Sequence, residues 1–459
     1  MKQNFGLLKW HLALVLIAVL ITLLWQAHII KNSWRFAQAY EQEWVAGSLL
    51  DGYGYSFDPA TAWLGPYSDG TTYSLTAWVE PLYTFIITIA FKIYGEYGRL
   101  ILTLFNVMWL GLSGILIFLL VGDIFDHRVG LYTTILFLIL YATRIDIILY
   151  VGNATLAGFL YCLSAYLLFR CIKKPTITNG FLLGMTIGIA NLNQASSLLI
   201  APLSVAMILI SFGLRDKNAW RASLILVMTT GILLSPWIVR NYVVFGTFVP
   251  ARSGFGYQLY LGNPALAHTF TPDLEFDSVE SVPLWKAESP QQALQLLRNL
   301  EYDAALANYS INVVSKNSTA EYSSYNEVER DRVFLRRSLD FIQTEPLLAL
   351  KMIVWKANAF LSFGEIRLAL IAIAAIIGSS LFIKDIRVAS LTLLVMGYMF
   401  PYISSLPLYY RYRSSIEPIL FILSGLFLGV CLQKSTFLWN AFREWIRVHV
   451  TLRAQQPTR

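Results

Sequence analysis

The chain has 459 residues, of which 56% are hydrophobic and 14% are charged, and its mean hydropathy is +0.56. Typical soluble domains carry about 25% charged residues, so the composition excludes a soluble protein and predicts a polytopic membrane protein. The net charge of +7 does not indicate a nucleic-acid partner, because the basic residues lie mostly at the ends of apolar runs, where they set topology.

The apolar runs predict about ten transmembrane helices in an all-α membrane protein. The first run follows Lys2 and Lys9 and lacks a small-residue cleavage site, so we expect an uncleaved span rather than a signal peptide. The runs are Leu8–Ile30, Arg99–Val121, Val129–Leu149, Asn153–Cys171, Ile177–Asn193, Ser196–Phe212, Arg221–Val239, Ile366–Ile383, Val388–Leu406 and Ser414–Leu432.

Two shorter apolar stretches, Pro81–Tyr94 and Ala349–Phe363, fit membrane-surface helices better than spans. If neither of them spans, seven basic residues at span ends between 128 and 221 face the cytoplasm, against Arg144 at the opposite ends, as the positive-inside rule favours. Both termini are then expected in the cytoplasm. The residues that face the cytoplasm in this arrangement are Arg128, Arg170, Lys173, Lys174, Arg215, Lys217 and Arg221.

This topology divides the chain into four parts and directs two large segments outward, at residues 31–98 and 241–348. Within 241–348 we expect helices at Pro290–Val314 and Ser324–Thr344. The parts are a membrane module at 1–240 with an outer loop at 31–98, an extracytoplasmic helical insert at 241–348, C-terminal transmembrane helices within 349–432, and a basic cytoplasmic tail at 433–459.

Acidic residues occur at two points of the first outer loop. Residues 40–50 have apolar side chains at helical spacing, which predicts an amphipathic surface helix carrying Glu41 and Glu43. Glu80 lies directly before Pro81, at the start of the short apolar stretch. The simpler interpretation is that Glu41 and Glu43 form the solvated face of the helix and that Glu80 is an interfacial acid before a helix-starting proline.

Arginines stand at the outward ends of the later spans, against the positive-inside bias. They are Arg240 and Arg252 after the span at Arg221–Val239, and Arg411 and Arg413 before the last span. An arginine at that depth needs an anionic partner, and its planar guanidinium suits bidentate phosphate recognition. The alternative is that Arg411 or Arg413 simply pairs with Glu417.

The acids and arginines therefore gather at the outer membrane surface, where a lipid-linked phosphate presents its head group. A carboxylate there could deprotonate an acceptor hydroxyl, and arginines could hold the phosphate leaving group. This pattern predicts an enzyme that uses a lipid-phosphate donor.

Five segments carry a resemblance to a known family. The sequence resembles membrane glycosyltransferases of the GT-C superfamily, most closely the bacterial glycosyltransferase family 39, ArnT-like and protein O-mannosyltransferase-like group. The segments are Glu41 with residues 46–57 (AGSLLDGYGYSF), 76–83 (TAWVEPLY), 91–95 (FKIYG), 235–263 (SPWIVRNYVVFGTFVPARSGFGYQLYLGN) and 409–420 (YYRYRSSIEPIL).

The resemblance implies a GT-C-like fold and a polyprenyl-phosphate sugar donor. It also implies inverting transfer, at the extracytoplasmic face of the cell (inner) membrane, to a lipid, glycan or protein acceptor. It assigns the catalytic base to Glu41, with Glu43 as second choice. Glu80 and Asp146 are rival candidates for the base because they are also acids in the outward part of the chain. It implies no cofactor; the alternative is a divalent metal held by Glu41, Glu80 or Asp146.

The sequence departs from the pattern of the family at three positions. Tyr40 precedes Glu41 where relatives carry an acidic pair, and Val79-Glu80-Pro81 replaces a Lys-Pro-Pro-type motif. Asn153 stands where relatives carry a further acid, with Asp146 nearby. These residues, together with Tyr83 of the second motif, remain site candidates.

Two other functions would also use a lipid-phosphate-linked sugar. One is a transporter or flippase of lipid-linked saccharides, which would typically carry intramembrane charges and inverted repeats. The other is a polysaccharide polymerase or ligase. The sequence contains no evident internal repeat, and the long outer loop suits the roof of an active site, so the glycosyltransferase hypothesis is preferred.

Overall fold

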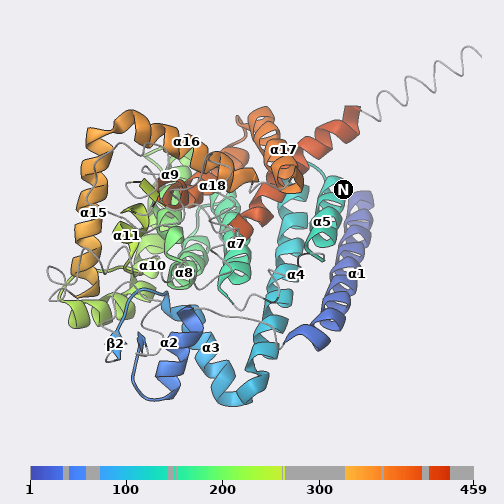
Figure 1. Cartoon of the computed structure of the whole chain (residues 1–459). Coiled ribbons are helices and arrows are strands. Elements are labelled where there is room, and N and C mark those ends of the chain that lie inside the picture. The colour runs from blue at the N-terminus through green and yellow to red at the C-terminus, as the bar shows by residue number, and fades with distance from the viewer. Residues whose placement is uncertain are drawn as a thin grey trace, which may run out of the picture.

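A computed structural model of the chain describes residues 2–34, 41–57, 73–142, 144, 149, 152–260, 262–263, 326–362, 366–405 and 413–434. These residues are almost entirely helical (Figure 1), which confirms the expected all-α class. The small exception is an antiparallel pair of two-residue strands, β1 (Ser56–Phe57) and β2 (Ser74–Leu75).

The helices up to the large insert are α1 (Lys2–Ser33), α2 (Glu41–Leu50), α3 (Pro81–Tyr94), η3 (Gly95–Tyr97), α4 (Gly98–Ile124), α5 (His127–Ala142), α7 (Ala154–Lys173), α8 (Ile177–Asn193), η4 (Ala195–Leu199), α9 (Ile200–Phe212), α10 (Lys217–Phe245) and α11 (Phe255–Tyr260). Those after it are α15 (Glu327–Thr344), α16 (Pro346–Ser362), α17 (Ile366–Phe382), α18 (Ile386–Ser404) and a last helix, Glu417–Lys434.

Within the described residues, seven helical stretches are long and apolar enough to cross a membrane, against the ten spans expected. The other three expected spans correspond to shorter helices: α5 has 16 residues, and α8 and α17 have 17 each. The seven stretches are Leu8–Lys31, Pro81–Ile124, Ala154–Lys173, Ala195–Phe212, Lys217–Phe245, Ile386–Ser404 and Glu417–Lys434.

Two expected helix ends are wrong. The span expected at Val129–Leu149 ends as a helix at Ala142, because the Arg144 N–H bonds the Tyr141 carbonyl in a tighter turn and the Arg144 side chain reaches Glu417. The span expected to end at Val239 continues to Phe245 as α10, and Gly246 then stops it in the left-handed conformation that glycine adopts readily. α10 therefore crosses the boundary expected between the membrane module and the insert.

The short helices are where the sequence predicts them. α3 has the bounds expected for the apolar stretch at Pro81–Tyr94, and Gly95, with φ of +55°, separates it from α4. α16 corresponds to the stretch expected at Ala349–Phe363. α15 corresponds to the insert helix expected at Ser324–Thr344, whereas the helix expected at Pro290–Val314 lies outside the described residues.

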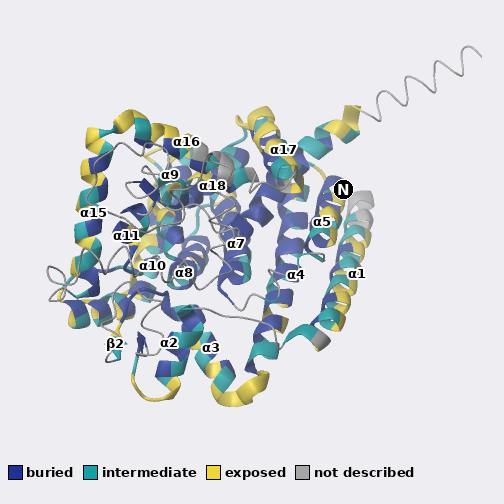
Figure 2. Cartoon of the chain, in the orientation of Figure 1, coloured by how far each residue is buried: buried dark blue, intermediate teal, exposed yellow. Residues whose placement is uncertain are grey.

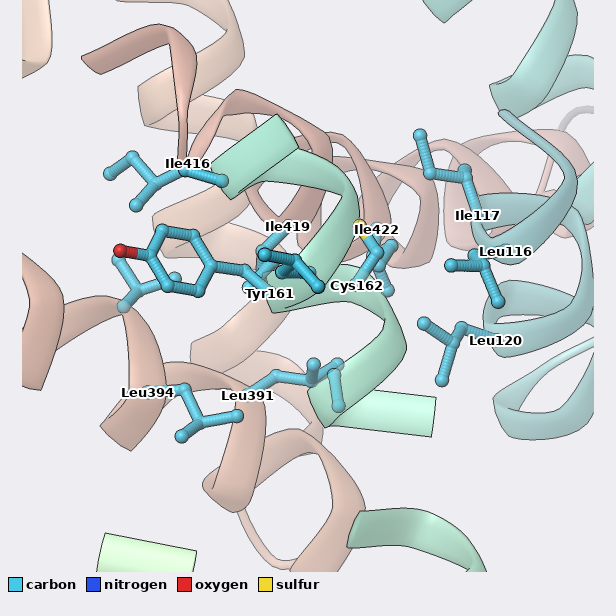
Figure 3. Close-up of a cluster of buried hydrophobic side chains, with 14 of the residues drawn as sticks. Leu116, Ile117, Leu120, Tyr161, Cys162, Leu391, Leu394, Ile416, Ile419 and Ile422 are labelled. Atoms are coloured by element: carbon cyan, nitrogen blue, oxygen red, sulfur yellow. The ribbon is translucent and has the colours of Figure 1, made fainter. Parts of the chain in front are cut away.

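The core of the bundle is formed where α4, α7, α18 and the last helix meet (Figure 3). α4 contributes Leu116 and Ile117, and α7 contributes Cys162. Leu391 of α18 and Ile419 of the last helix complete this group, and all five side chains are buried. Close packing here is what fixes the helices that lead to the candidate site.

Three glycines allow α8 and α10 to pack backbone to backbone. Gly180, Gly184 and Gly188 recur every four residues and so lie on one face of α8. A Cβ atom at Gly180 would lie 2.3 Å from the Ala222 carbonyl oxygen, and one at Gly184 would lie 2.5 Å from that of Leu226. Larger side chains on this face would therefore force the two helices apart.

Charged residues from three helices contact one another at one end of the helix bundle. Asp123 at the end of α4 pairs with Lys173 at the end of α7, and its carbonyl accepts a hydrogen bond from Arg387 at the start of α18. Gly429 of the last helix packs on Phe125 at this same end. The candidate site lies at the opposite end, where α2, α3, η4 and α15 meet.

Candidate active site

Two of the predicted acids and one of the predicted arginines meet around Trp78. The Trp78 indole N–H donates a hydrogen bond to the Glu41 carboxylate over 3.1 Å, and the Arg252 guanidinium carbon lies 5.1 Å from the centre of the indole. The Arg252 guanidinium is also 3.7 Å from the Glu80 carboxylate. Glu41, Trp78, Glu80 and Arg252 therefore form one group, which we call the acid–arginine cluster.

The backbone around Glu80 follows from the proline after it. A residue before proline avoids the helical conformation, and Glu80 is extended, with φ of −73° and ψ of 143°, while Pro81 begins α3. Its carboxylate is buried and accepts a hydrogen bond of 3.0 Å from the Ala195 N–H at the start of η4. Glu80 thus links α3, η4 and Arg252.

A glycine makes room for the Trp78 ring. Gly254 has φ of +90°, and a Cβ atom there would lie 2.4 Å from the ring. Only glycine satisfies both the backbone conformation and the close approach. The segment that carries Arg252 can therefore lie flat against Trp78.

The start of α15 holds the loops that carry the cluster. The buried Glu327 carboxylate accepts hydrogen bonds from the Thr76 hydroxyl over 2.6 Å, from the Ala77 N–H over 3.0 Å, and from the Ser253 hydroxyl. Burial raises the pKa of Glu327, and these three donors oppose that shift. Thr76 and Ala77 precede Trp78, and Ser253 follows Arg252, so one carboxylate ties together the two segments of the cluster.

Asp331, one turn further along α15, reinforces this arrangement. Its carboxylate accepts a hydrogen bond of 2.9 Å from the Tyr257 N–H, and burial raises its pKa. Sequence reasoning missed both Glu327 and Asp331. A signal was present in Asn326 and Glu329, which form a capping box that fixes the start of α15, but nothing local indicates that the first turn contacts residues 76 and 253.

Arg240, which the sequence predicts as a ligand of the donor phosphate, donates hydrogen bonds to two main-chain carbonyls. Its guanidinium donates to the Thr76 carbonyl over 2.7 Å and to the Tyr55 carbonyl over 3.1 Å. The rings of Tyr55 and Trp237 lie beside it. Arg240 therefore joins the end of α10 to the strand pair that leads to Trp78.

Arg413 lies in a different place, inside the bundle. It is fully buried and lies 3.3 Å from Glu417, which is the pairing that the sequence left open as an alternative. Tyr141 donates a hydrogen bond to Glu417, and Arg144 lies 3.8 Å from it. Arg411 lies outside the described residues.

The remaining described candidates have partners outside the cluster. Glu43 pairs with Arg99 on another side of α2, as expected for side chains two positions apart on a helix. Tyr83 donates to Asn106 over 3.2 Å. The side chains of Asn153 and Asn193 each donate a hydrogen bond to the main-chain carbonyl of the other residue. Asp146 lies outside the described residues.

A buried lysine fixes the C-terminal end of α18. The Lys356 ammonium lies 3.0 Å from the Gly262 carbonyl, 3.1 Å from the Asn263 side-chain oxygen, and 3.2 Å from the carbonyls of Ser404 and Ser405. Burial lowers its pKa to about 7. Lys356 thereby joins the segment at residues 262–263 to the end of α18 at residues 404–405.

Among the described residues, no group of three His, Cys, Asp or Glu side chains lies close enough to hold a metal ion. The acid–arginine cluster offers instead one accessible carboxylate, one buried carboxylate and a guanidinium. Glu41 is partly exposed whereas Glu80 is buried, so Glu41 is the acid that an incoming hydroxyl could reach.

Comparison with known proteins agrees with this architecture. Residues 79–239 match the family model described as dolichyl-phosphate-mannose-protein mannosyltransferase. A crystal structure of the Archaeoglobus fulgidus oligosaccharyltransferase tethered to an acceptor peptide aligns at 15% identity with a TM-score of 0.51. These matches show that the chain has a GT-C-like fold. The region that matches the family model begins at Val79, one residue after Trp78, and ends at Val239, one residue before Arg240.

The structural alignment covers 93% of this chain and 50% of the oligosaccharyltransferase, so the chain spans about half the length of that enzyme. A second structure of the same archaeal enzyme, with Zn and sulfate, aligns at 16% identity and a TM-score of 0.50, covering 97% and 52% of the two chains. ArnT from Cupriavidus metallidurans aligns at 12% identity and a TM-score of 0.31, covering 93% and 78%. No curated protein matches the sequence.

Proposed function

We propose that this protein transfers a sugar from a polyprenyl-phosphate-linked donor to a hydroxyl group of an extracytoplasmic lipid, glycan or protein. The proposal rests on the GT-C-like fold, on the family-model match at residues 79–239, and on one geometric observation: Trp78 contacts both the Glu41 carboxylate and the Arg252 guanidinium. Attack on a phosphate-activated sugar requires a base near the incoming hydroxyl and a cation near the leaving phosphate.

In the proposed reaction, the acceptor hydroxyl gives its proton to Glu41 while its oxygen bonds to the anomeric carbon of the sugar. The bond from that carbon to the phosphate oxygen breaks, and the electron pair leaves with the polyprenyl phosphate. Arg252 stabilises the charge that develops on this phosphate. Attack from the face opposite the leaving group inverts the anomeric centre.

Glu80 has a different role in this proposal. Its carboxylate is buried, accepts the Ala195 N–H and lies 3.7 Å from Arg252. We assign to it the orientation of Arg252 rather than proton transfer. Without Glu80 the guanidinium would keep its contact with Trp78 but would lose the anion that fixes its direction.

The four predicted phosphate-binding arginines divide into two groups. We assign direct contact with the donor phosphate to Arg252 and, from the sequence alone, to Arg411. Arg240 and Arg413 already have partners, in two main-chain carbonyls and in Glu417 respectively. For these two we propose that they support the site without touching the donor.

A transporter of lipid-linked saccharides remains the second candidate, and one observation favours it. Arg413 and Glu417 are buried inside the helix bundle, and charged groups within spans are common in transport proteins. A transporter would move the donor without cleaving it, so the fate of the donor separates the two functions.

The experiment is an incubation of the purified protein with polyprenyl-phosphate hexoses and pentoses in the presence of membrane extract. Release of free polyprenyl phosphate that depends on Glu41 supports the enzyme. Movement of intact donor across proteoliposomes, with no release in the wild-type protein, would contradict it and support the transporter.

A further inference from the structure

A cavity lies away from the acid–arginine cluster, between the end of α1 and the turn that joins α3 to α4. It has a volume of about 420 Å³ and is lined by Trp34, Glu43, Phe91, Gly95, Glu96 and Arg99. The end of α1 and the start of α4 lie side by side in Figure 1, and Figure 2 shows that the turn after α3 is exposed. We call it the α1–α4 cavity.

The walls of this cavity carry both signs of charge. Arg99 is 40% exposed and bonds one Glu43 oxygen through a single terminal nitrogen. A guanidinium has five N–H donors, so within the described residues Arg99 retains donors for another anion. Glu96 is exposed, and its carboxylate can accept hydrogen bonds from a cation that sits between it and Glu43.

The position of the cavity corresponds to a membrane boundary. The apolar stretch that could cross the membrane in α1 ends at Lys31, three residues before Trp34. Trp34 packs against Tyr97, with ring centres 5.6 Å apart. Tryptophan and tyrosine typically occupy the depth of the lipid head groups, and this pair stands beside the charged walls.

An apolar track leads away from the cavity along α3. Phe85, Ile89 and Ile93 recur every four residues on one face of the helix, and they are 44%, 57% and 64% exposed. Leu24 of α1, the helix that packs against α4, is 62% exposed. Acyl chains covering these side chains would remove them from water, with the head group directed toward the cavity.

We propose that the α1–α4 cavity binds the head group of a phospholipid that carries a phosphate and a primary ammonium, as in phosphatidylethanolamine. Arg99 binds the phosphate, Glu96 and Glu43 accept hydrogen bonds from the ammonium, and the exposed face of α3 covers the acyl chains. This inference does not depend on the proposed sugar transfer, because none of these residues belongs to the acid–arginine cluster.

The charges distinguish this lipid from the other common ones. Two carboxylates beside one arginine disfavour an anionic lipid such as phosphatidylglycerol, which brings no cation to meet Glu96. A quaternary choline has no N–H and cannot hydrogen-bond a carboxylate, although it could still use the aromatic rings. A primary ammonium uses both carboxylates.

The test is competitive lipid retention by the full chain, measured by native mass spectrometry. The protein is solubilised with equal amounts of isotopically distinct phosphatidylethanolamine, phosphatidylcholine and phosphatidylglycerol. We expect phosphatidylethanolamine to be retained about tenfold over either competitor. Water-soluble glycerophosphoethanolamine, which lacks acyl chains, should displace it only at far higher concentration.

Three variants make this test specific. Arg99→Gln should abolish the retention, and Glu96→Gln, which leaves the Glu43–Arg99 pair intact, should remove the preference for ethanolamine over choline. Arg128→Gln, an exposed arginine just beyond the other end of α4, should retain the lipid like the wild type. Equal retention of the three lipids by the wild type would overturn the proposal. So would an unchanged preference for phosphatidylethanolamine in Glu96→Gln, even if Arg99→Gln failed to fold.

Discussion

Trp78 donates its indole N–H to Glu41 over 3.1 Å and at the same time presents its ring to Arg252, whose guanidinium carbon lies 5.1 Å from the ring centre. Glu41 and Trp78 are 37 positions apart in the chain. One side chain therefore sets the direction of the proposed base and the location of the proposed phosphate ligand. Motif 76–83 owes its importance to this double contact as much as to its acid.

Trp78→Phe should separate the two contacts. Phenylalanine keeps a ring for Arg252 but removes the N–H, so Glu41 loses the donor that orients it. One hydrogen bond to a charged group contributes about 1.5 kcal/mol or more, and we expect kcat to fall roughly tenfold with little change in KM for the donor. Trp109→Phe, in α4, is the matched control. Equal activity of both variants would show that the indole N–H is dispensable.

Arg252→Lys should weaken donor binding, whereas Arg240→Lys should lower the stability of the protein. Lysine at 252 keeps the charge but loses the planar fork, so KM for the donor should rise about tenfold while the melting temperature stays near wild type. Lysine at 240 cannot hold the carbonyls of both Thr76 and Tyr55 as the guanidinium does, so the melting temperature should fall. The reverse pattern, with affinity lost only at 240, would restore Arg240 as the phosphate ligand.

Glu327→Gln should loosen the loops on which the cluster stands. A glutamine offers one acceptor and two N–H donors to three groups that now donate to a carboxylate, so at least one donor loses its partner. An unsatisfied buried group costs about 1–3 kcal/mol. We expect a lower melting temperature and a lower kcat, whereas Asp340→Asn on the exposed side of α15 changes neither. An unaltered kcat in Glu327→Gln would mean that α15 is not part of the site.

The sequence predicts the all-α class and the position of most described helices, because these depend on local signals. Apolar length located α3, and helical spacing on α2 separated Glu43 from Glu41. The partners of the arginines could not be predicted, since they are set by packing. Arg240 binds the main-chain carbonyls of residues 55 and 76, and no pattern of side chains predicts such contacts. Glu327 binds the Thr76 hydroxyl and the Ala77 N–H from an insert that the sequence predicts as a separate part.

Lys356 predicts a pH dependence of stability. Its pKa is about 7 in the folded protein against 10.5 for an ordinary lysine, so between these values the unfolded chain binds the extra proton. Stability should therefore rise as pH increases from about 7 toward 10, by up to about 1.4 kcal/mol per unit. Lys356→Met should lose this rise. Thermal melts in detergent at pH 7 and pH 9 measure it, and the same increase in both proteins would assign it to another group.

The central claim is that Glu41, and not Glu80, accepts the proton of the acceptor. The direct measurement is single-turnover sugar transfer by Glu41→Gln and Glu80→Gln in the same assay, with donor binding measured separately. Glutamine at 41 can still accept the Trp78 N–H, so donor binding should persist while the rate falls about 10²–10⁴-fold. Glu80→Gln should bind donor more weakly through Arg252 but transfer the sugar at a measurable rate. Wild-type transfer by Glu41→Gln together with an inactive Glu80→Gln would contradict this account and assign the base to Glu80.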